Sequence, residues 1–361
     1  MKRRQFLRGA GIAAAASAVA APAVAQSMPE VKWRCASSFP KSLDIMYGTA
    51  ETFAKAVAEN TDNKFQIDVF PAGEIAPALQ AADAVQKGTV EMCHTASYYV
   101  DKDPTFALGT AAPFGLNARM QNAWQYFGGG IELMNDFYKG FGIYALPCGN
   151  TGCQMAGWFR KEVKDAADLK DLKIRIGGLA GLVLAKLGAA PQLLASRDIQ
   201  SSLESGALDA AEWVGPYDDE KRGFQKVAPY YYYPGWWEGS FMLHNFFNLE
   251  AWNNLPKVYQ SVLRTASGSA NEWMLAKYDA ANPPALKRLV TNGAQLRAFP
   301  QPVMEACLKA ALEVYAETSA KNEAFKKVWG QMLAFRNDGY LWWQVAEASY
   351  DSFLIRNRTR T

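Results

Sequence analysis

The sequence has few of the residues on which catalytic and metal sites usually depend. It contains only two histidines, His94 and His244, and no G-x-S-x-G, Walker, H-E-x-x-H, C-x-x-C or G-x-G-x-x-G pattern. A lone histidine in a strand-like segment is more often a packed side chain than a catalytic base. The sequence therefore gives no support to any mechanism that these motifs would identify.

Cysteine is also scarce, and its number is odd, so at least one cysteine has no partner within the chain. Cys148 and Cys153 are near enough in sequence to form a disulfide in an oxidising compartment. Buried free thiols are the favoured interpretation, because free cysteine packs like a small apolar side chain. The C-x4-C spacing matches no zinc or redox signature. The five positions are Cys35, Cys93, Cys148, Cys153 and Cys307.

No apolar run is long enough to cross a bilayer, apart from an N-terminal segment that has another explanation. The chain begins with the basic segment Met1–Arg8, which contains paired arginines, and continues into an alanine-rich stretch. This order predicts a signal peptide of the twin-arginine type over residues 1–25, and hence export to the periplasm. A membrane anchor is the less favoured alternative, because Ser17 and Pro22 interrupt a short apolar stretch.

The exported chain would carry almost no net charge. Removal of the signal peptide takes away four basic residues and no acidic one, so the formal charge falls from +3 to −1. A near-neutral protein has no overall basic bias toward nucleic acid or anionic lipid. We therefore expect no nucleic-acid partner, and any charge that serves a ligand must be local.

Strand and helix patterns alternate through the first two thirds of the chain. Alternating apolar residues predict strands at 31–37, 65–70 and 90–95 with helices between them, and from Leu255 onward the pattern is mostly helical. Such repetition predicts an α/β protein with mainly parallel sheets. The length of 361 residues and a second α/β set after about residue 143 predict two lobes joined by crossing strands, with long C-terminal helices.

Arg175 stands at a position suited to an anion. It ends an isoleucine-rich predicted strand and is followed, after Ile176, by Gly177 and Gly178. A guanidinium there can grip a carboxylate with two hydrogen bonds, and the glycines leave room for a ligand and for the N-terminus of the next helix. A surface arginine on an edge strand is an equally good interpretation of the spacing alone.

Neutral amides occur at a glycine-flanked point in the segment Gly149–Gln154, just before a strand predicted at 154–159. Asn150 and Gln154 can donate to a ligand oxygen or offer a carbonyl oxygen to a hard cation. For Asn150, a turn in which Asn and Gly serve backbone geometry is the better interpretation of the sequence alone.

Two acids lie in unusually apolar or aromatic surroundings. Glu212 falls in a strand predicted at 208–213, and Glu238 lies in the stretch Tyr230–Gly239, which holds six aromatic residues. A buried carboxylate needs Arg, Lys or a metal as partner, and two carboxylates can hold a hard cation. The aromatics would form a rigid pocket wall. The alternative is an apolar seam between lobes with Glu238 in solvent.

Several segments resemble one family of transport proteins, the extracytoplasmic solute receptors of TRAP transporters (the DctP-like family), and some of them resemble its 2-oxo-acid receptors. The segments similar to the family at large are the signal peptide, Ala36–Pro40, Phe70–Glu74, Leu172–Arg175 and Leu203–Ala210. Those similar to the 2-oxo-acid receptors are Gly149–Gly152, Glu212–Lys221 and Tyr230–Gly239.

This resemblance implies a two-lobe, periplasmic-binding-protein-like (Venus-flytrap) fold that closes on its ligand. Lobe I would take residues 26–149 plus about 239–275, and lobe II residues 150–238 plus part of the C-terminal helical region. Residues from about 276 to 361 would pack on the lobes as helices. Some relatives are homodimers, and the long C-terminal helices suit that arrangement.

The resemblance also implies a binding site. Arg175 would hold the ligand carboxylate, and a sodium ion, or alternatively calcium, would bridge ligand and protein. The ligand contacts expected from the family are Arg175, Gln154, Asn150, Tyr98, Tyr99 and Trp213. The expected metal ligands are Gln154, Glu212, the backbone carbonyl of Trp213, and Glu238.

The predicted function is capture of a small 2-oxo monocarboxylate, such as pyruvate or 2-oxobutyrate, for delivery to TRAP membrane subunits, with no catalysis. A receptor for lactate or another 2-hydroxy acid is one alternative. A second is an exported enzyme acting on small carboxylates, with Glu212 as its base. A third is a receptor-like domain that signals to a membrane kinase.

Overall fold

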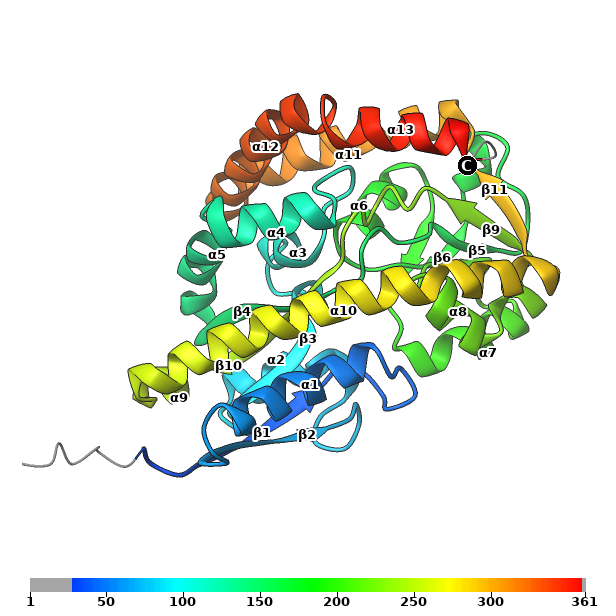
Figure 1. Ribbon diagram of the computed structural model, residues 1–361. Coiled ribbons are helices and arrows are strands. Elements are labelled where there is room, and N and C mark those ends of the chain that lie inside the picture. Colours follow the sequence, from blue (N-terminus) through cyan, green and yellow to red (C-terminus); the bar gives the residue numbers. More distant parts are fainter. Residues whose placement is uncertain (1–27, 359–361) are drawn as a thin grey trace, which may run out of the picture. The chain divides into compact units, whose positions relative to one another are not determined.

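The protein was analysed as a computed structural model, in which residues 28–358 are described (Figure 1). The signal peptide predicted at residues 1–25 lies outside this range. The segment from Val31 onward forms one compact unit, and the helices and strands of the described residues belong to it. None of the helices in this part of the chain is long and apolar enough to span a membrane.

Sheet A contains five strands in the order β2-β1-β3-β10-β4. Strand β1 runs parallel to β2 and β3, so that Cys35 lies opposite Val69 on one side and Met92 on the other. Strand β10 runs antiparallel to both of its neighbours. The strands are β1 (Val31–Ser37), β2 (Phe65–Phe70), β3 (Met92–Ala96), β4 (Ile143–Asn150) and β10 (Met242–Asn248).

Sheet B contains six short strands in the order β11-β9-β5-β8-β6-β7. It is also mixed, because β5 runs antiparallel to β8 and β9 while the other pairs are parallel. The mainly parallel sheets that the sequence predicts are therefore only partly present. The strands are β5 (Gly157–Phe159), β6 (Lys173–Arg175), β7 (Ala190–Gln192), β8 (Ala210–Ala211), β9 (Tyr230–Tyr233) and β11 (Gln295–Ala298).

Two predicted strands are shorter in the structure than in the sequence-based prediction. Strand β5 begins only at Gly157, since the Gln154 and Met155 amides donate to the carbonyls of Glu238 and Val214 instead of to a ladder. Strand β8 ends at Ala211, before Glu212. Strand β11 comes from the C-terminal region, which the sequence pattern predicts as helical. Gln154, before β5, and Glu212, after β8, are both residues of the candidate site.

The chain passes between the sheets after β4, and returns between β9 and β10. Helix α10 (Lys257–Thr291) also links the two regions, because it packs against β4 and α1 as well as α8 (Figure 1). The sequence correctly predicts crossing segments and long C-terminal helices. The lobe boundaries proposed above stay a prediction, because the whole segment from Val31 forms one compact unit.

Helices cover the two sheets, and most are amphipathic segments anticipated by the sequence. The glycines at 128–130 divide one predicted helix into α4 and α5, with Gly129 in the left-handed region at φ 82°. The remaining helices are α1 (Met46–Glu59), α2 (Ala81–Gln86), α3 (Thr105–Thr110), α4 (Ala118–Phe127), α5 (Gly130–Tyr138), α6 (Gly178–Lys186), α7 (Ser196–Ser205), α8 (Pro216–Arg222), α9 (Leu249–Asn254), α11 (Gln301–Lys321), α12 (Glu323–Trp343) and α13 (Glu347–Asn357).

Both histidines and all five cysteines are structural in character. Every cysteine is a free thiol, and all but Cys153 are buried, so Cys148 and Cys153 form no disulfide. His94 and His244 lie on β3 and β10 in the interior of sheet A, where the Nε2 atom of His94 is 2.8 Å from the Cys148 carbonyl oxygen. Burial lowers the pKa of His94 to about 4 and that of His244 to about 3, with repulsion from His94 adding to the second shift.

These buried histidines predict a loss of stability in acid. The unfolded chain protonates them near pH 6.5, well above their folded pKa values, so their contribution is complete above that pH and declines as the pH falls toward 4. At pH 4, the buried His244 lowers the free energy of unfolding of the wild type by an amount on the order of 3 kcal/mol, and His244→Phe removes this penalty. Urea unfolding between pH 7 and 4 should show that the free energy of unfolding falls more steeply with pH for wild type than for the variant. A constant difference would contradict the assignment.

Candidate functional site

Arg175, at the end of β6, forms a buried ion pair with Glu212, which follows β8. The Nη1 group of Arg175 donates to the Glu212 carboxylate, with an N···O distance of 2.6 Å, and to the Glu212 backbone carbonyl at 2.8 Å. In return the Glu212 amide donates to the Arg175 carbonyl. The Arg175 guanidinium also lies 4.9 Å from the centre of the Trp213 ring. Adjacent strands β6 and β8 thus place these three residues together.

The two crossing segments bring Gln154 and Glu238 to the same place. The Gln154 amide donates to the Glu238 carbonyl at 3.1 Å, and the Met155 amide donates to the Val214 carbonyl. Gly235 makes this approach possible, because a Cβ atom there would lie 2.3 Å from the Gln154 carbonyl oxygen. The crossings and the end of β8 therefore meet at one point.

Three side-chain oxygen atoms in this cluster are buried and have no hydrogen-bond donor within the described residues. They belong to Gln154 (Oε1), Glu212 (Oε1) and Glu238 (Oε2). Buried acceptors are normally paired, and hard cations such as Na⁺ and Ca²⁺ prefer carboxylate and amide oxygens. Among the described residues, no group of three or more His, Cys, Asp or Glu side chains is arranged so that it could hold a metal ion by itself. The donor set fits a hard cation held by two acids and an amide.

The electrostatics of the cluster also favour a second positive charge. Burial raises the pKa of Glu212 above the usual carboxyl range, even though Arg175 opposes the shift. Burial, and then repulsion by Glu212, raises the pKa of Glu238 still more. Burial is the largest influence on the pKa of Arg175 and lowers it, but the combined attraction of Glu212, Tyr98, Tyr99 and Glu238 raises that pKa overall, so Arg175 remains cationic. One guanidinium therefore does not balance two buried carboxylates.

Tyr98 and Tyr99 reach the site from the sheet A side, directly after β3. Tyr98 lies close enough to Glu238, and Tyr99 close enough to Arg175, for each pair to influence the other's pKa. Tyr98 also packs against Gly177 and Gly178, where added Cβ atoms would lie 2.6 and 3.1 Å from its ring. These glycines were expected to leave room for a ligand, but here they accommodate a tyrosine from the other sheet.

Asn150 is used differently from the other predicted contacts. Its side-chain oxygen accepts from the Gly152 amide, and its amide nitrogen donates to Ser240 in the second crossing. These bonds hold the first crossing segment to the second, which agrees with the turn interpretation. A ligand contact by Asn150 stays a prediction.

All eight predicted site residues are buried, none of them more than 9 % exposed. The structure brings together Arg175, Glu212, Trp213, Gln154 and Glu238, with both tyrosines against them. The sequence reasoning missed Asp219, whose carboxylate accepts from Trp158 and Tyr231 and holds the segment after Trp213 in place. The paired acids Asp218-Asp219 just beyond Glu212 were a visible signal, but a buried role could not be read from them.

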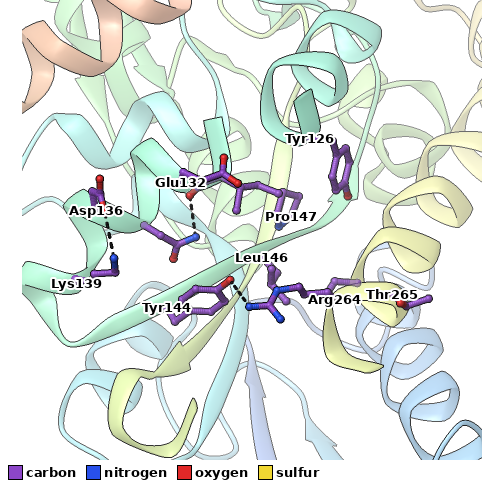
Figure 2. A pocket seen from close by; sticks show the side chains of 12 residues that line it. Tyr126, Glu132, Asp136, Lys139, Tyr144, Leu146, Pro147, Arg264 and Thr265 are labelled. Atoms are coloured by element: carbon purple, nitrogen blue, oxygen red, sulfur yellow. Dashed lines mark hydrogen bonds and ion pairs between the residues drawn. The ribbon is translucent and has the colours of Figure 1, made fainter. Parts of the chain in front are cut away.

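A separate cavity of about 530 Å³ lies beside β4, α5 and α10. Figure 2 shows Arg264 from α10 pointing toward Tyr144, to whose hydroxyl it donates, and the ion pair of Asp136 and Lys139. None of the eight predicted site residues lines this cavity. The candidate site is therefore the closed cluster between the two sheets and not this open surface pocket.

Comparison with known proteins identifies the family. Residues 36–322 match the family model of bacterial extracellular solute-binding proteins, family 7 (DctP). The chain belongs to this family. It is a solute-binding protein of the TRAP type, and its mixed two-sheet fold is the fold of the TRAP receptors.

Two relatives are more closely similar. The chain is 48% identical to the monocarboxylate 2-oxoacid-binding periplasmic protein of Nostoc, over 98% of this chain and 99% of that protein. It is 47% identical, with a TM-score of 0.90, to a TRAP solute-binding protein of Bordetella bronchiseptica, covering 92% of this chain and 99% of the other. That structure is a mixed-occupancy dimer with co-purified calcium and picolinate in one site.

A third relative holds a different pair of ligands. The TRAP solute-binding protein of Pseudoalteromonas atlantica, 39% identical with a TM-score of 0.87, contains sodium and pyruvate. The match covers 90% of this chain and 99% of the Pseudoalteromonas chain. A small carboxylate with a hard cation is therefore a recurrent content of these structures.

The contact of Tyr98 with Gly177 provides a test of closure. Gly177 has an extended backbone (φ −112°), so alanine is tolerated there by the backbone but meets the Tyr98 ring in the closed form. We expect Gly177→Ala to weaken ligand binding at least tenfold with little change in the melting temperature of the ligand-free protein. Gly181→Ala is the matched control, because the atom nearest to a Cβ at that position would lie 3.6 Å away, at an ordinary contact distance. Equal affinity of both variants in calorimetry would contradict closure through this contact.

Proposed function

We propose that this receptor binds a small 2-oxo monocarboxylate, such as pyruvate or 2-oxobutyrate, together with a hard cation. The observation that carries the proposal is the meeting of Arg175 with three unpaired oxygen atoms, from Gln154, Glu212 and Glu238, in one buried cluster. The Nostoc and Pseudoalteromonas relatives, described above, support the ligand class.

In this proposal Arg175 holds the ligand carboxylate by charge-assisted hydrogen bonds, each worth about 1.5–3 kcal/mol. Gln154, Glu212, Glu238 and the Trp213 carbonyl hold the cation, which attracts the ligand carboxylate and 2-oxo oxygen. Trp213 has a buried Nε1–H without an acceptor in the described structure, so it can donate to the ligand. Tyr98 and Phe241, with ring centres 5.4 Å apart, supply an apolar wall for a short alkyl group.

A count of charges discriminates between cations. The cluster contains two carboxylates and one guanidinium, and the ligand adds a further negative charge. A divalent cation brings the occupied site to neutrality, whereas sodium leaves one negative charge in a buried place, where it is costly. The sequence favoured sodium with calcium as the alternative. The charge balance supports calcium unless one carboxyl group is protonated.

The proposal places the receptor in the periplasm, where it delivers its ligand to TRAP membrane subunits, and extends to a homodimer. Helix α13 has no buried residue, and apolar side chains at the end of α12 and along α13 are exposed. A second copy would bury this apolar surface. The exposed residues are Tyr340, Leu341, Trp342, Val345, Tyr350, Phe353, Leu354 and Ile355.

An exported enzyme with Glu212 as base has less support. Glu212 is buried, and one of its carboxylate oxygens already accepts a hydrogen bond from Arg175 at 2.6 Å, so that oxygen is occupied by a protein partner. A receptor for lactate or another 2-hydroxy acid uses the same contacts, because a hydroxyl can also bind the cation. Competition between pyruvate and lactate in calorimetry distinguishes the two receptor functions.

The role of Arg175 is best tested with lysine. Alanine would leave Glu212 buried without a partner, at about 3–5 kcal/mol, and would confuse folding with binding. Arg175→Lys keeps the charge but loses the planar fork, so affinity for pyruvate should fall by roughly 10- to 100-fold, as loss of one charge-assisted bond requires. Calorimetry at saturating calcium measures this. Unchanged affinity in a folded variant would refute the carboxylate role.

Glu238→Gln tests the cation without breaking the Arg175–Glu212 pair. Loss of one negative charge should weaken calcium-dependent binding of pyruvate and bring sodium-supported binding closer to it. The measurement is calorimetry after chelation, with calcium or sodium added back in choline chloride. If wild type and variant both bind pyruvate equally well without either ion, the bridging cation is wrong.

A further inference from the structure

Asp44 makes a polar contact that joins the two sheet regions outside the binding cluster. It lies between β1 and α1, on the sheet A side, whereas its partners Tyr217 and Lys221 belong to α8, which follows β8 of sheet B. The Tyr217 hydroxyl donates to Asp44 Oδ2 at 3.0 Å, and Lys221 forms an ion pair with Oδ1. The Lys221 ammonium also lies 3.7 Å from the centre of the Tyr217 ring.

Helix α8 is firmly attached to the site and to α10. Tyr217 follows Trp213 by only four residues, and its amide donates to Asn282 of α10 at 3.0 Å. The neighbouring Asp218 accepts from Tyr278. Because α8 is held in this way, a pull on Tyr217 and Lys221 acts on the segment that contains Glu212 and Trp213.

The Asp44 contact lies where the two regions face each other. A cavity of about 410 Å³ is lined by Pro40 and residues 72–80 from sheet A connections, and by Ala195–Arg197 from sheet B. Asp44 is four residues beyond Pro40, so it belongs to the same side of the opening. Burial opposes ionisation of Asp44, but Lys221 and Tyr217 lower its pKa overall, and it is therefore a carboxylate at neutral pH.

We propose that Asp44, Tyr217 and Lys221 form a closure latch, a polar contact made when the sheet regions close on the ligand and broken when they open. These residues do not touch the binding cluster; they position it by favouring the closed population. The apparent dissociation constant rises as that population falls, so the latch lowers the ligand dissociation rate. The ligand-binding effect rests on the proposed function.

The contact is partly exposed, with side chains 46% and 34% exposed for Asp44 and Lys221. Exposed pairs are weak and screened by salt. The hydrogen bond of Tyr217 adds to the ion pair, and the effect on affinity should be about threefold to tenfold. Lys277 of α10 also lies 3.7 Å from Asp44, and its removal serves to separate general charge neutralisation from the latch.

The test compares Asp44→Ala with Asp83→Asn. The Asp83–Lys102 pair has a similar exposure, 36% and 47%, but joins two residues of the sheet A region. With saturating calcium, and ionic strength varied by choline chloride, stopped-flow tryptophan fluorescence should show pyruvate leaving Asp44→Ala threefold to tenfold faster than wild type or Asp83→Asn. The difference should shrink at high ionic strength, and Lys221→Met should add little to Asp44→Ala.

Small-angle scattering of the ligand-free proteins gives a readout without ligand. The radius of gyration of Asp44→Ala should be no smaller than that of wild type. It should be larger if some ligand-free wild-type molecules are already closed. Dissociation rates and scattering identical to wild type overturn the latch, as does a slower association rate with unchanged dissociation, which would mean electrostatic steering. If wild type binds no 2-oxo acid, the proposed function fails. In that case the latch is judged on scattering alone, and a radius of gyration of wild type that is no smaller than that of Asp44→Ala overturns it as well.

Discussion

The structure is organised around a buried imbalance of charge. Arg175 neutralises one of two carboxylates, Glu212 and Glu238, that lie in the same closed cluster. Taking ionised groups out of water is expensive, and proteins tolerate it only where partners complete the charge. The oxygen atoms of Gln154, Glu212 and Glu238 that have no donor among the described residues are the positions at which a cation would do so. Under the proposed function, a bound cation and a bound anion would therefore support each other in this site.

This constraint explains features of the fold that strand patterns do not. Gln154 and Glu238 are on separate crossing segments, and their backbones are joined by a hydrogen bond that requires glycine at position 235. Strand β5 begins only at Gly157, because the amides of Gln154 and Met155 bond to Glu238 and Val214, and strand β8 ends at Ala211, one residue before Glu212. The short strands of sheet B are thus a consequence of building a site at their ends, where side chains from several segments converge.

The sequence predicted the α/β architecture, the crossing segments and the need of Glu212 for a partner, whereas for Arg175 the spacing left a surface position equally open. Periodicity reports which side of a strand is buried, and an acid in an apolar stretch needs a partner. The prediction that Arg175, Glu238 and Gln154 share one site came from the family resemblance, because sequence spacing carries no information about long-range contacts. Strand β11 was missed because Gln295–Ala298 has only four residues between two long helices. The packing of Tyr98 on Gly177 was missed because a glycine after a strand indicates only that something approaches closely.

Gly177 and Asp44 together indicate how a closed binding site can still release its ligand. The Tyr98 ring against Gly177 gives the closed form tight complementarity, but it is a packing contact with no charge, so it changes little with ionic conditions. The contact of Asp44 with Tyr217 and Lys221 is polar and partly exposed, so water can replace each of its bonds at small cost. A receptor that must pass its ligand to a membrane partner benefits from this division. Apolar packing defines the closed geometry, while a weak polar contact at the rim sets how often the site opens.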